Sequence, residues 1–562
     1  MARKKYACDF ETTTDPNDCR VWAYGWMEIG NTSNYKIGNS LDEFMTWVKD
    51  VKADLYFHNL KFDGEFIVHW LLTHGFKHDD SGQPKTFHTI ISSMGQWYMI
   101  DICYGYKGKR KIHTVIYDSL KKLPFPIAKI AKDFHLPVQK GEIDYNAYRP
   151  VGHEITEEEK AYIIGDIRIL AEALKIQFDQ GLDRMTNGSD SLAGFKAIIT
   201  KKLFDVYFPQ LSLSVDADIR KAYRGGFTWV NPKFQGKDLG EGIVFDVNSL
   251  YPSQMYMRPL PYDMPVFFEG EYQQDDEYPL YIQHMRCEFE LKEGKIPTIQ
   301  LKKNMMFKPN EYLTSSDGES VDLYVSNIDL DLIKEHYHLY NVEYINGWKF
   351  KARVGLFKMF IDKWMHIKNT STGAVKLLAK LMLNSLYGKF GTNPDVTGKV
   401  PYLKEDGSVG FKRGQEEFKD PVYIPLGVFI TSWARYTTIT TAQKCYDRII
   451  YCDTDSIHLI GTDVPDAIKD IVDDKKLGYW KHESTFKRAR FIRQKTYIEE
   501  IYLNDEKTET KLNVKCAGMP DSVKKKVTWE NFHVGFKSNG KLVPKHVPGG
   551  VVLVDTEFTL KG

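Results

Sequence analysis

Acidic residues beside short, hydrophobic, strand-like segments are the feature that most constrains how this chain can fold. They occur in two groups, one within residues 9–166 and the other within residues 246–455. Each group has its own pattern of alternating strands and helices around it. The sequence therefore predicts separate α/β units, each with a carboxylate-rich site.

The length and composition are those of a multidomain globular protein. A chain of 562 residues is too long for one hydrophobic core, and roughly 150 residues per domain gives about three to four domains. Seven scattered cysteines without a Cys-x-x-Cys pair argue against a disulfide framework or a structural zinc site and fit a reducing compartment. Residues 1–14 lack the apolar core of a signal peptide, and no apolar stretch is long enough to span a membrane.

The net charge of +1 argues mildly against a protein that coats nucleic acid without selectivity. Basic runs nevertheless occur at 107–111, 487–495 and 524–526, and acidic stretches such as 275–277 offset them. Such segregation suits a protein with a basic groove. The alternative is that each run is simply a solvated face.

Periodicity in the first 185 residues predicts an α/β unit. Alternation predicts strands over 5–10, 54–58, 96–102 and 111–117, and helical spacing predicts a helix over 65–74. Residues 156–178 are typical of a long helix, with Thr156 as the N-cap and Glu159 completing a capping box. Gly181 and the segment 187–189 then predict a loop and a domain boundary.

A second unit follows from about residue 190. A strand over 243–247 ends in a predicted turn before Pro252, and two helical segments within 357–389 are separated by 369–373. Residues 426–445 form a long periodic run, and 447–460 predicts a hairpin. The polar, strand-rich stretch 258–355 and the Gly-rich stretch 391–420 are interpreted as insertions.

The first acidic group combines three local patterns. Asp9 and Glu11 alternate on one strand and so share a face, where they could hold two divalent metals roughly 4 Å apart. Asp63 adds a carboxylate at a strand–helix junction, and Tyr162 and Asp166 lie four apart on one helix face. Alone, Asp-x-Glu is more simply a solvated strand edge, but together these patterns indicate a metal-dependent phosphodiester-cleaving site.

The second acidic group could serve phosphoryl transfer. Asp246 ends a hydrophobic strand, and Asp453 and Asp455 are two apart in the predicted hairpin, where they could face one way. Two metals held between them could activate a hydroxyl and hold a triphosphate. Ordinary turn chemistry is the alternative for Asp-Thr-Asp on its own.

A helix between these acids carries a polar stripe. Lys380, Asn384 and Tyr387 recur on one face, and Gly388 is expected to be the C′ residue that ends the helix. The lysine could meet phosphates, and the ring could lie against a base. A solvated polar stripe is the alternative.

The motifs taken in order resemble known families. The segments DFE (9–11), HNLKFD (58–63) and Tyr162-x-x-x-Asp166 are similar to the three motifs of the DEDDy 3′→5′ exonucleases, which have an RNase H-like fold. The segments DVNSLYP (246–252), KLMLNSLYG (380–388) and YCDTDS (451–456) resemble motifs A, B and C of the family B (α-like) DNA polymerases. YRGG (223–226), TSWAR (431–435) and KTY (495–497) resemble further elements of that family. The segment SLKKLPFP (119–126) narrows the resemblance to the protein-primed polymerases of small Bacillus phages, the phi29 type. This resemblance covers nearly the whole chain.

The resemblance implies an α/β multidomain fold, in which an RNase H-like 3′→5′ exonuclease domain precedes a right-hand polymerase with palm, fingers and thumb and two subfamily insertions. The implied domains are 1–187 (exonuclease), 188–257 (palm, first part), 258–355 (terminal-protein-region insertion 1), 356–390 (fingers), 391–420 (insertion 2), 421–526 (palm, remainder) and 527–562 (thumb). Near 505–510 the chain is expected to be shorter than its relatives, with an effect on the thumb.

The resemblance also implies roles for individual residues. The implied exonuclease residues are Asp9, Glu11, Asp63, Tyr162, Asp166 and Lys140, with the four carboxylates as metal ligands. The implied polymerase metal ligands are Asp246, Asp455 and the carbonyl of Val247, with Asp453 nearby and also catalytic. The implied nucleotide-binding residues are Tyr251, Lys368, Lys376, Lys380, Asn384, Tyr387 and Val247. The implied DNA-binding residues are Thr12, His58, Asn59, Phe62, Ser119, Leu120, Phe125, Tyr223, Gly225, Gly226, Thr431, Arg435, Lys495 and Tyr497.

The implied function is DNA-directed DNA synthesis, primed by a protein, with strand displacement, high processivity and proofreading on a viral linear genome. The implied cofactor is Mg²⁺, replaceable by Mn²⁺, with two ions in each active site. The implied partners are primer-template DNA, dNTPs, a terminal protein and a viral single-stranded-DNA-binding protein, with the enzyme acting as a monomer in the cytoplasm of an infected bacterium and not at a membrane. A stand-alone nuclease, a non-enzymatic replication scaffold and an RNA-making or RNA-templated enzyme remain as alternatives, although Tyr251 speaks for deoxynucleotides.

Overall fold

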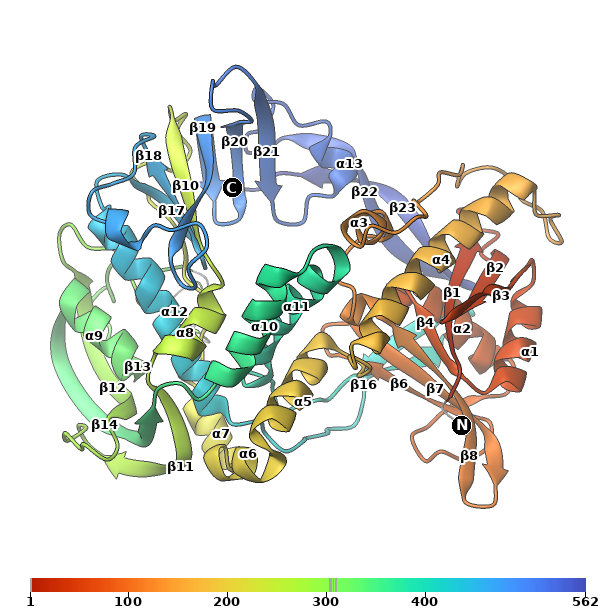
Figure 1. Cartoon of the computed structure of the whole chain (residues 1–562), viewed down its shortest axis with the longest axis horizontal. Coiled ribbons are helices and arrows are strands. Elements are labelled where there is room, and N and C mark those ends of the chain that lie inside the picture. Colours follow the sequence, from red (N-terminus) through yellow and green to blue (C-terminus); the bar gives the residue numbers. More distant parts are fainter. Residues whose placement is uncertain (1–2, 303–305, 307, 309–310) are drawn as a thin grey trace.

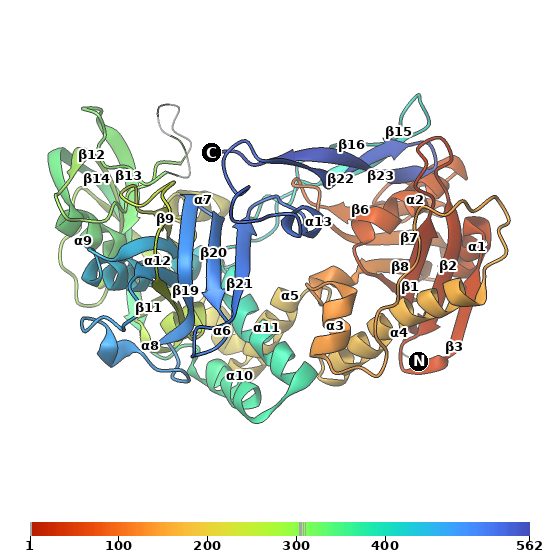
Figure 2. The same cartoon turned by 90° about the horizontal axis from the view of Figure 1, so that it is seen from above.

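The computed structural model describes residues 3–302, 306, 308 and 311–562. The predictions for the N-terminal segment and for the first insertion therefore lie partly outside the described residues, at 1–2, 303–305, 307 and 309–310. None of the described helices combines the length and the apolar character needed to cross a bilayer. Figures 1 and 2 show two lobes joined by helices and by two hairpins.

The N-terminal lobe is built on an eight-stranded mixed sheet in the order β3-β2-β1-β4-β8-β7-β6-β5. Its strands are β1 (Lys5–Thr12), β2 (Val21–Glu28), β3 (Asn31–Gly38), β4 (Asp54–Phe57), β5 (Lys77–His78), β6 (Thr86–Ile91), β7 (Trp97–Lys107) and β8 (Arg110–Asp118). Its helices are α1 (Leu41–Val51), α2 (Leu60–Thr73), α3 (Ile127–Asp133) and α4 (Glu157–Asp179), with the short η1 (Ser119–Lys121). The long helix α4 packs on β1 and β2, and so faces the strand that carries Asp9 and Glu11.

Local capping confirms one helix prediction and corrects another. The Thr156 hydroxyl accepts the Glu159 N–H, and the Glu159 carboxylate accepts the Thr156 N–H at 3.0 Å, so α4 begins with the predicted capping box. The predicted loop at 187–189 is wrong, because α5 (Asn187–Ile199) begins there with Thr186 as its N-cap. Asn, Gly and Ser are poor in helix interiors, but the Thr186 cap stabilises them in a first turn.

The second lobe contains a seven-stranded sheet in the order β21-β20-β19-β10-β18-β17-β9. Its strands are β9 (Thr228–Val230), β10 (Gly242–Val247), β17 (Ile449–Asp453), β18 (Ser456–Ile460), β19 (Trp480–Arg493), β20 (Thr496–Tyr502) and β21 (Thr510–Cys516). The predicted hairpin over 447–460 is β17–β18, whereas Pro252 lies inside the first turn of α8 (Leu250–Met257), where proline is tolerated. The segment 503–509 joins β20 to β21 within this sheet.

Helices and smaller sheets surround this second sheet. The helices are α6 (Lys201–Tyr207), α7 (Leu213–Arg220), α9 (Asn327–His336), α10 (Lys358–Thr370), α11 (Gly373–Lys389), α12 (Ile424–Lys444) and α13 (Asp521–Lys524), with the short η2 (Lys469–Ile471). The first insertion forms a four-stranded sheet, β11-β14-β12-β13, from β11 (Leu260–Glu269), β12 (Leu280–Leu291), β13 (Val321–Ser326) and β14 (Tyr337–Arg353). The second insertion contains the hairpin of β15 (Lys399–Leu403) and β16 (Val409–Arg413), and the C-terminal segment contains that of β22 (Lys537–Val547) and β23 (Gly550–Thr559). Both hairpins run back to the N-terminal lobe and pack on α2 (Figure 2).

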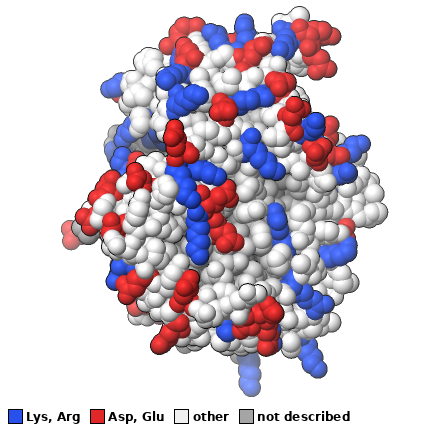
Figure 3. Space-filling model, turned by 90° about the vertical axis from the view of Figure 1, so that its left-hand side faces the viewer, with Lys and Arg blue, Asp and Glu red and all other residues white. Residues whose placement is uncertain are grey.

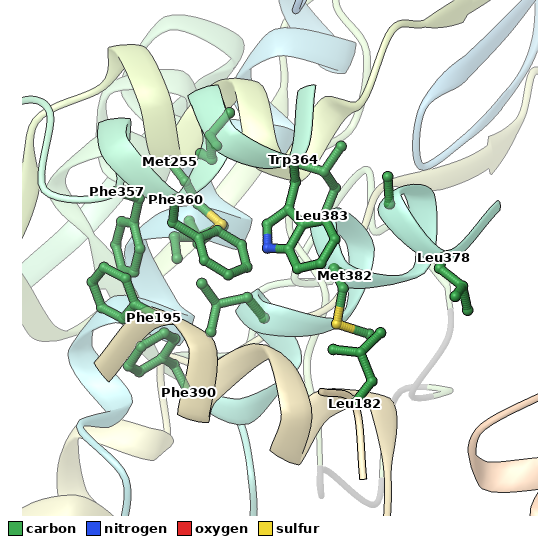
Figure 4. Close-up of a cluster of buried hydrophobic side chains, with 14 of the residues drawn as sticks. Leu182, Phe195, Met255, Phe357, Phe360, Trp364, Leu378, Met382, Leu383 and Phe390 are labelled. Atoms are coloured by element: carbon green, nitrogen blue, oxygen red, sulfur yellow. The ribbon is translucent and has the colours of Figure 1, made fainter. Parts of the chain in front are cut away.

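An aromatic cluster fixes the orientation of α10 and α11 (Figure 4). Phe195 of α5 stacks on Phe357 with ring centroids 4.6 Å apart, and the side chains of Trp364 and Met382 are buried in the same cluster. Burial of each such side chain stabilises the fold by about 1.5–3 kcal/mol. Gly388 is not the C′ residue that was predicted, because α11 continues to Lys389 and carries the chain to Phe390, which is fully buried in this cluster.

Figure 3 shows the side of the molecule that carries the first insertion, and positive and negative side chains are interspersed on this face. This agrees with the near-neutral net charge of the whole chain. Any basic surface for nucleic acid must therefore be local, which directs attention to the two acidic groups and their surroundings.

Candidate active sites

The first acidic group lines one cavity of about 790 Å³. The cavity is lined by Asp9, Glu11, Thr12, His58, Asn59, Phe62, Asp63, Lys140, Tyr145, Tyr162 and Asp166, among others. Strand β1, the start of α2 and the middle of α4 meet here because β1 pairs with β4 and α4 lies across both β1 and β2. The structure thus brings together the three motifs that the sequence held apart.

Burial concentrates negative charge in this cavity. Burial first, and then the charge of Asp166, raise the pKa of Asp9 to about 7. Burial, Asp9 and Asp166 raise the pKa of Glu11 to about 9, and burial with the charges of Asp9 and Glu11 raises the pKa of Asp63 well above its ordinary value. These raised pKa values mean that the negative charges of the carboxylates are poorly compensated, so the cavity lacks positive charge.

Lys140 supplies part of that positive charge. Its ammonium forms an ion pair with Asp166 and donates to the Tyr162 hydroxyl at 3.1 Å. The Tyr162 hydroxyl also lies 2.6 Å from that of Tyr145. The lysine therefore links the phenol and the helix carboxylate predicted from the Tyr-x-x-x-Asp spacing.

The donor set fits hard divalent cations. Asp166 Oδ1 is buried and has no hydrogen-bond partner among the described residues, so one lone-pair site points into the cavity unused. No group of three His, Cys, Asp or Glu side chains within the described residues is already arranged to enclose an ion. Lys140 accounts for part of this, since it occupies the other oxygen of Asp166.

His58 is held rigidly at the cavity wall. Its Nδ1 lies 3.0 Å from the Ser119 hydroxyl and its Nε2 lies 2.7 Å from the Phe125 carbonyl oxygen. Ser119 is fully buried, and Ser119, Leu120 and Phe125 are not among the residues that line the cavity. Ser119 and Phe125 orient the histidine through these contacts.

The second acidic group lies where β10 ends beside the β17–β18 turn. The Val247 N–H donates to the Asp455 carbonyl oxygen at 2.8 Å, which ties the two segments together. Burial, then Asp455, then Glu483 raise the pKa of Asp246 to about 7, and burial also raises that of Asp455. Asp246 Oδ1 is likewise buried without a hydrogen-bond partner among the described residues, so a divalent cation fits here too.

Asp453 differs from Asp455, contrary to the expectation that the two could face one way. Its carboxylate accepts from Lys495 Nζ at 2.8 and 3.0 Å and from the Tyr451 hydroxyl at 3.1 Å. Thr454 between the two acids has φ of +58°, and this left-handed residue breaks the alternation that would align their side chains. Asp453 is therefore paired with a cation, whereas Asp455 remains beside Asp246.

The polar stripe of α11 extends over the same site. Tyr387 stacks on Tyr251 of α8 with centroids 3.9 Å apart and an interplanar angle of 14°. Lys368 donates to the Ser249 hydroxyl at 3.3 Å, and burial with the charges of Lys380 and Lys376 lowers its pKa. Lys380 and Asn384 are exposed on α11, so the predicted face is open.

Three residues expected to bind DNA are buried instead. The Thr431 hydroxyl donates to the Gly427 carbonyl, and Tyr497 stacks on Phe491. Arg435 forms an ion pair with Asp329 at 2.6 Å, and it donates to the carbonyls of Arg224 and Gly225.

The YRGG segment, 223–226, is positioned by these interior contacts. A Cβ on Gly226 would come within 2.6 Å of Thr454 Oγ1, so glycine allows the segment to approach the β17–β18 turn. Arg435 fixes the carbonyls of the same segment. A sequence motif cannot distinguish a residue that touches DNA from one that holds such a residue in place.

Sequence reasoning also missed residues of both sites. Leu542, Leu553 and Asp555 of the C-terminal hairpin line the first cavity, and Tyr145 touches Tyr162 there. Lys481 and Glu483 of β19 approach the second site. No local spacing marks any of them, because each arrives from a strand or loop that pairs only in the tertiary fold.

The chain is similar to DNA polymerases over its full length. The family described as DNA polymerase type B, organellar and viral, matches residues 45–474. The DNA polymerases of Bacillus phages phi29 and PZA are each 69% identical over 100% of both chains, and that of Streptococcus phage Cp-1 is 34% identical over 99% of this chain and 98% of its own. The phi29 DNA polymerase complexed with primer-template DNA and incoming nucleotide superposes with a TM-score of 0.97 at 69% identity over 100% of both chains. Its complex with single-stranded DNA gives 0.96 at 68% identity over 100% of both.

Proposed function

Because this chain belongs to the type B DNA polymerases, within them to the protein-primed phi29 type of Bacillus phages, we propose a residue-by-residue assignment of its two active sites. The protein is a DNA-directed DNA polymerase with an intrinsic 3′→5′ exonuclease. One observation carries the assignment: two separate sheets each present buried, mutually repelling carboxylates, one with Lys140 and Tyr162, the other with Lys368 and Tyr387.

The first cavity is the exonuclease site in this proposal. Asp9, Glu11, Asp63 and Asp166 would hold two divalent ions, and such ions would supply the positive charge that lowers the pKa of a water and stabilises the leaving oxygen. Tyr162, fixed by Lys140, would orient the attacking water. The buried, unpaired oxygen of Asp166 supports this donor set.

The frayed primer end would enter along the residues that line the cavity beside these acids. Phe62 and Asn59 line the cavity, and His58 is held in one orientation by Ser119 and Phe125. Thr12 lies beside the acids on β1. Leu120 of η1 would contact the strand outside the cavity.

The second site would perform nucleotidyl transfer. Asp246, Asp455 and the Val247 carbonyl would hold two ions, Mg²⁺ or Mn²⁺, and such ions would supply the positive charge needed to activate the primer 3′-hydroxyl and to hold the triphosphate. Lys368, Lys376 and Lys380 would bind that triphosphate. Lys495 neutralises Asp453 and, from its exposed position, would also reach the primer end.

Nucleotide selection would depend on two stacked rings. Tyr387 would pack on the incoming base, with Asn384 beside it, and Tyr251 would crowd the 2′ position of a ribonucleotide. Their stacking at 3.9 Å supports this assignment, because each ring immobilises the other. Tyr223, Gly225 and Gly226 would guide DNA between the two sites, positioned from within by Arg435 and Thr431, while the buried Tyr497 would support Lys495.

The domain division follows the same assignment. We place the exonuclease at 1–187, the palm at 188–257 and 421–526, the fingers at 356–390 and the thumb at 527–562, with insertions at 258–355 and 391–420. The first insertion would receive a terminal protein, and the second would enclose DNA together with the thumb. Primer-template DNA, dNTPs and a viral single-stranded-DNA-binding protein complete the partners of a monomeric enzyme in the infected bacterial cytoplasm.

A primer-extension assay tests both assignments. The protein is incubated with Mg²⁺ and a 5′-labelled primer annealed to a longer template, with and without dNTPs. We expect extension with dNTPs to be lost in Asp455→Ala, and shortening without dNTPs to be lost in Asp9→Ala with Glu11→Ala. Loss of both activities in either variant would contradict the separation of the two sites.

A further inference from the structure

One lysine beside the polymerase carboxylates, Lys481 of β19, has no role in the assignment above. It stands directly opposite Asp246 in the antiparallel pairing of β10 with β19. Directly opposed residues in such a pair project from the same face of the sheet, with Cβ atoms about 5 Å apart. The ammonium of Lys481 therefore extends over the edge that the Asp246 carboxylate faces.

The backbone before Lys481 is tied to the turn after Asp246. The Asn248 N–H donates to the Tyr479 carbonyl at 2.9 Å, and the Gly478 N–H donates to the Asn248 carbonyl at 2.9 Å. Lys368 reaches the next residue of that turn, Ser249, from the fingers side. Two lysines thus approach one turn from two different elements.

The charges of these lysines converge. Burial first, and then the charges of Lys380, Lys376 and Lys481, lower the pKa of Lys368, and the charge of Lys481 also acts to lower the pKa of Asp246. The ion pair recorded for Lys481 is with Glu483 at 3.8 Å, and the Lys481 side chain remains 45% exposed. Such a long, exposed pair stabilises little, so most of the positive charge of Lys481 remains available to a ligand.

We propose that Lys481 binds the triphosphate of the incoming nucleotide and completes, from the palm side, the group of lysines formed by Lys368, Lys376 and Lys380. The four converging ammonium groups repel one another in the free protein, and this repulsion is relieved when a polyanion binds between them. The inference rests on the proposed placement of the triphosphate beside Lys368.

Steady-state nucleotide insertion by the full-length enzyme tests it. We expect Lys481→Ala to raise the KM for dNTP about five- to tenfold with little change in kcat, the size of a partly exposed charge-assisted contact. Lys481→Arg should restore most of the affinity, and inorganic pyrophosphate should inhibit Lys481→Ala less than the parent enzyme. Exonuclease activity on single-stranded DNA reports that the variant is folded.

Matched variants separate the possible failures. Lys487→Ala, a change to an exposed lysine further along the same strand, should leave the KM unchanged. If Lys368→Ala raises the KM and Lys481→Ala does not, the inference is overturned and the triphosphate site stands. If neither changes it, the proposed triphosphate site itself fails. If Lys481→Ala loses its effect in a Glu483→Gln background, Lys481 acts through Glu483, which also overturns direct binding.

Discussion

His546 of β22 lies with its Nδ1 2.7 Å from the Glu65 carboxylate of α2, so a contact spanning 481 residues joins the C-terminal hairpin to the N-terminal lobe. The tip of the second insertion meets them, since His69 Nε2 lies 3.1 Å from the Gly407 carbonyl and 3.1 Å from the Gly549 N–H. One ring nitrogen cannot donate to the first and accept from the second at once, so the tautomer of His69 decides which of the two hairpins it is hydrogen-bonded to. The hairpins β15–β16 and β22–β23 therefore meet on α2, and we call this three-way contact the closed junction.

The closed junction should weaken as pH rises. The hydrogen bond to Glu65 raises the pKa of His546 above 6.5, against burial and the charges of Lys404 and Lys61, and burial raises that of Glu65. The raised pKa of His546 means that the closed form binds this proton more tightly, so the stabilisation that His546 contributes is complete below pH 6.5 and is lost as pH passes its raised pKa. His69 faces Gly407, Gly549 and the charge of His74, and burial lowers its pKa, so its shift has the opposite direction to that of His546.

Product length per binding event measures this effect. With a DNA trap, we expect shorter products at pH 8.5 than at pH 6.5, and a smaller difference between the two in His546→Gln. His533→Gln, a change to an exposed histidine that contacts Val534 of its own loop, is the matched control. Equal pH profiles for His546→Gln and the parent enzyme would rule out this junction as the cause.

Asp9→Asn should stabilise the protein while it abolishes exonuclease activity. The pKa of Asp9 is raised from 3.8 to about 7, so the stability that its protonated form contributes is present below pH 4 and is lost as pH rises through about 7. Asparagine cannot ionise and avoids that loss. In a domain of this size each kcal/mol shifts the melting temperature by roughly 2–4 °C.

Thermal unfolding in the absence of divalent cations checks this. The melting temperature of Asp9→Asn should exceed that of the parent enzyme at pH 8 and approach it at pH 5. Asp15→Asn, at an exposed site on the following loop, serves as the control. A difference that does not change with pH would show that ionisation of Asp9 is not what costs stability.

Tyr251→Val should relax selection against ribonucleotides. Removing the ring opens the space next to the sugar and leaves Tyr387 without its stacking partner, and we expect the ratio of kcat/KM for dNTP over rNTP to fall about 100-fold. Tyr251→Phe keeps the ring and should keep the selection. Equal relaxation in Tyr251→Phe would assign selection to the hydroxyl group instead.

Gly165→Ala should stabilise α4 by about 0.5–1 kcal/mol, since glycine loses more backbone entropy than alanine in a helix interior. A Cβ at this position would meet Gln139 O at 3.9 Å and Val138 at 4.0 Å, which are ordinary contacts. The melting temperature should rise by roughly 1–4 °C with exonuclease activity retained. Loss of exonuclease activity in a stabilised variant would instead show that motion of α4 beside Asp166 is required.

Local patterns in the sequence were reliable wherever one or two turns of backbone decide the structure. The capping box of Thr156 and Glu159 forms as predicted, and Asp9 with Glu11, and Tyr162 with Asp166, share faces because strand and helix periods impose it. Helix ends were less reliable. Gly388 and residues 187–189 were misplaced because burial of Phe390 and the Thr186 cap extend helices through residues that favour turns elsewhere.

The sequence by itself determined the chemistry of this protein, since spacing and motif order place the carboxylates, the lysines of α11 and the family. Only the tertiary structure decided which residues reach the sites and which support them. Arg435 and Thr431 lie inside, Leu553 enters the exonuclease cavity, and Lys481 joins Asp246 through strand pairing. The physical reason is that periodicity fixes neighbours within a few residues, whereas contacts between distant segments depend on packing and pairing of the whole chain.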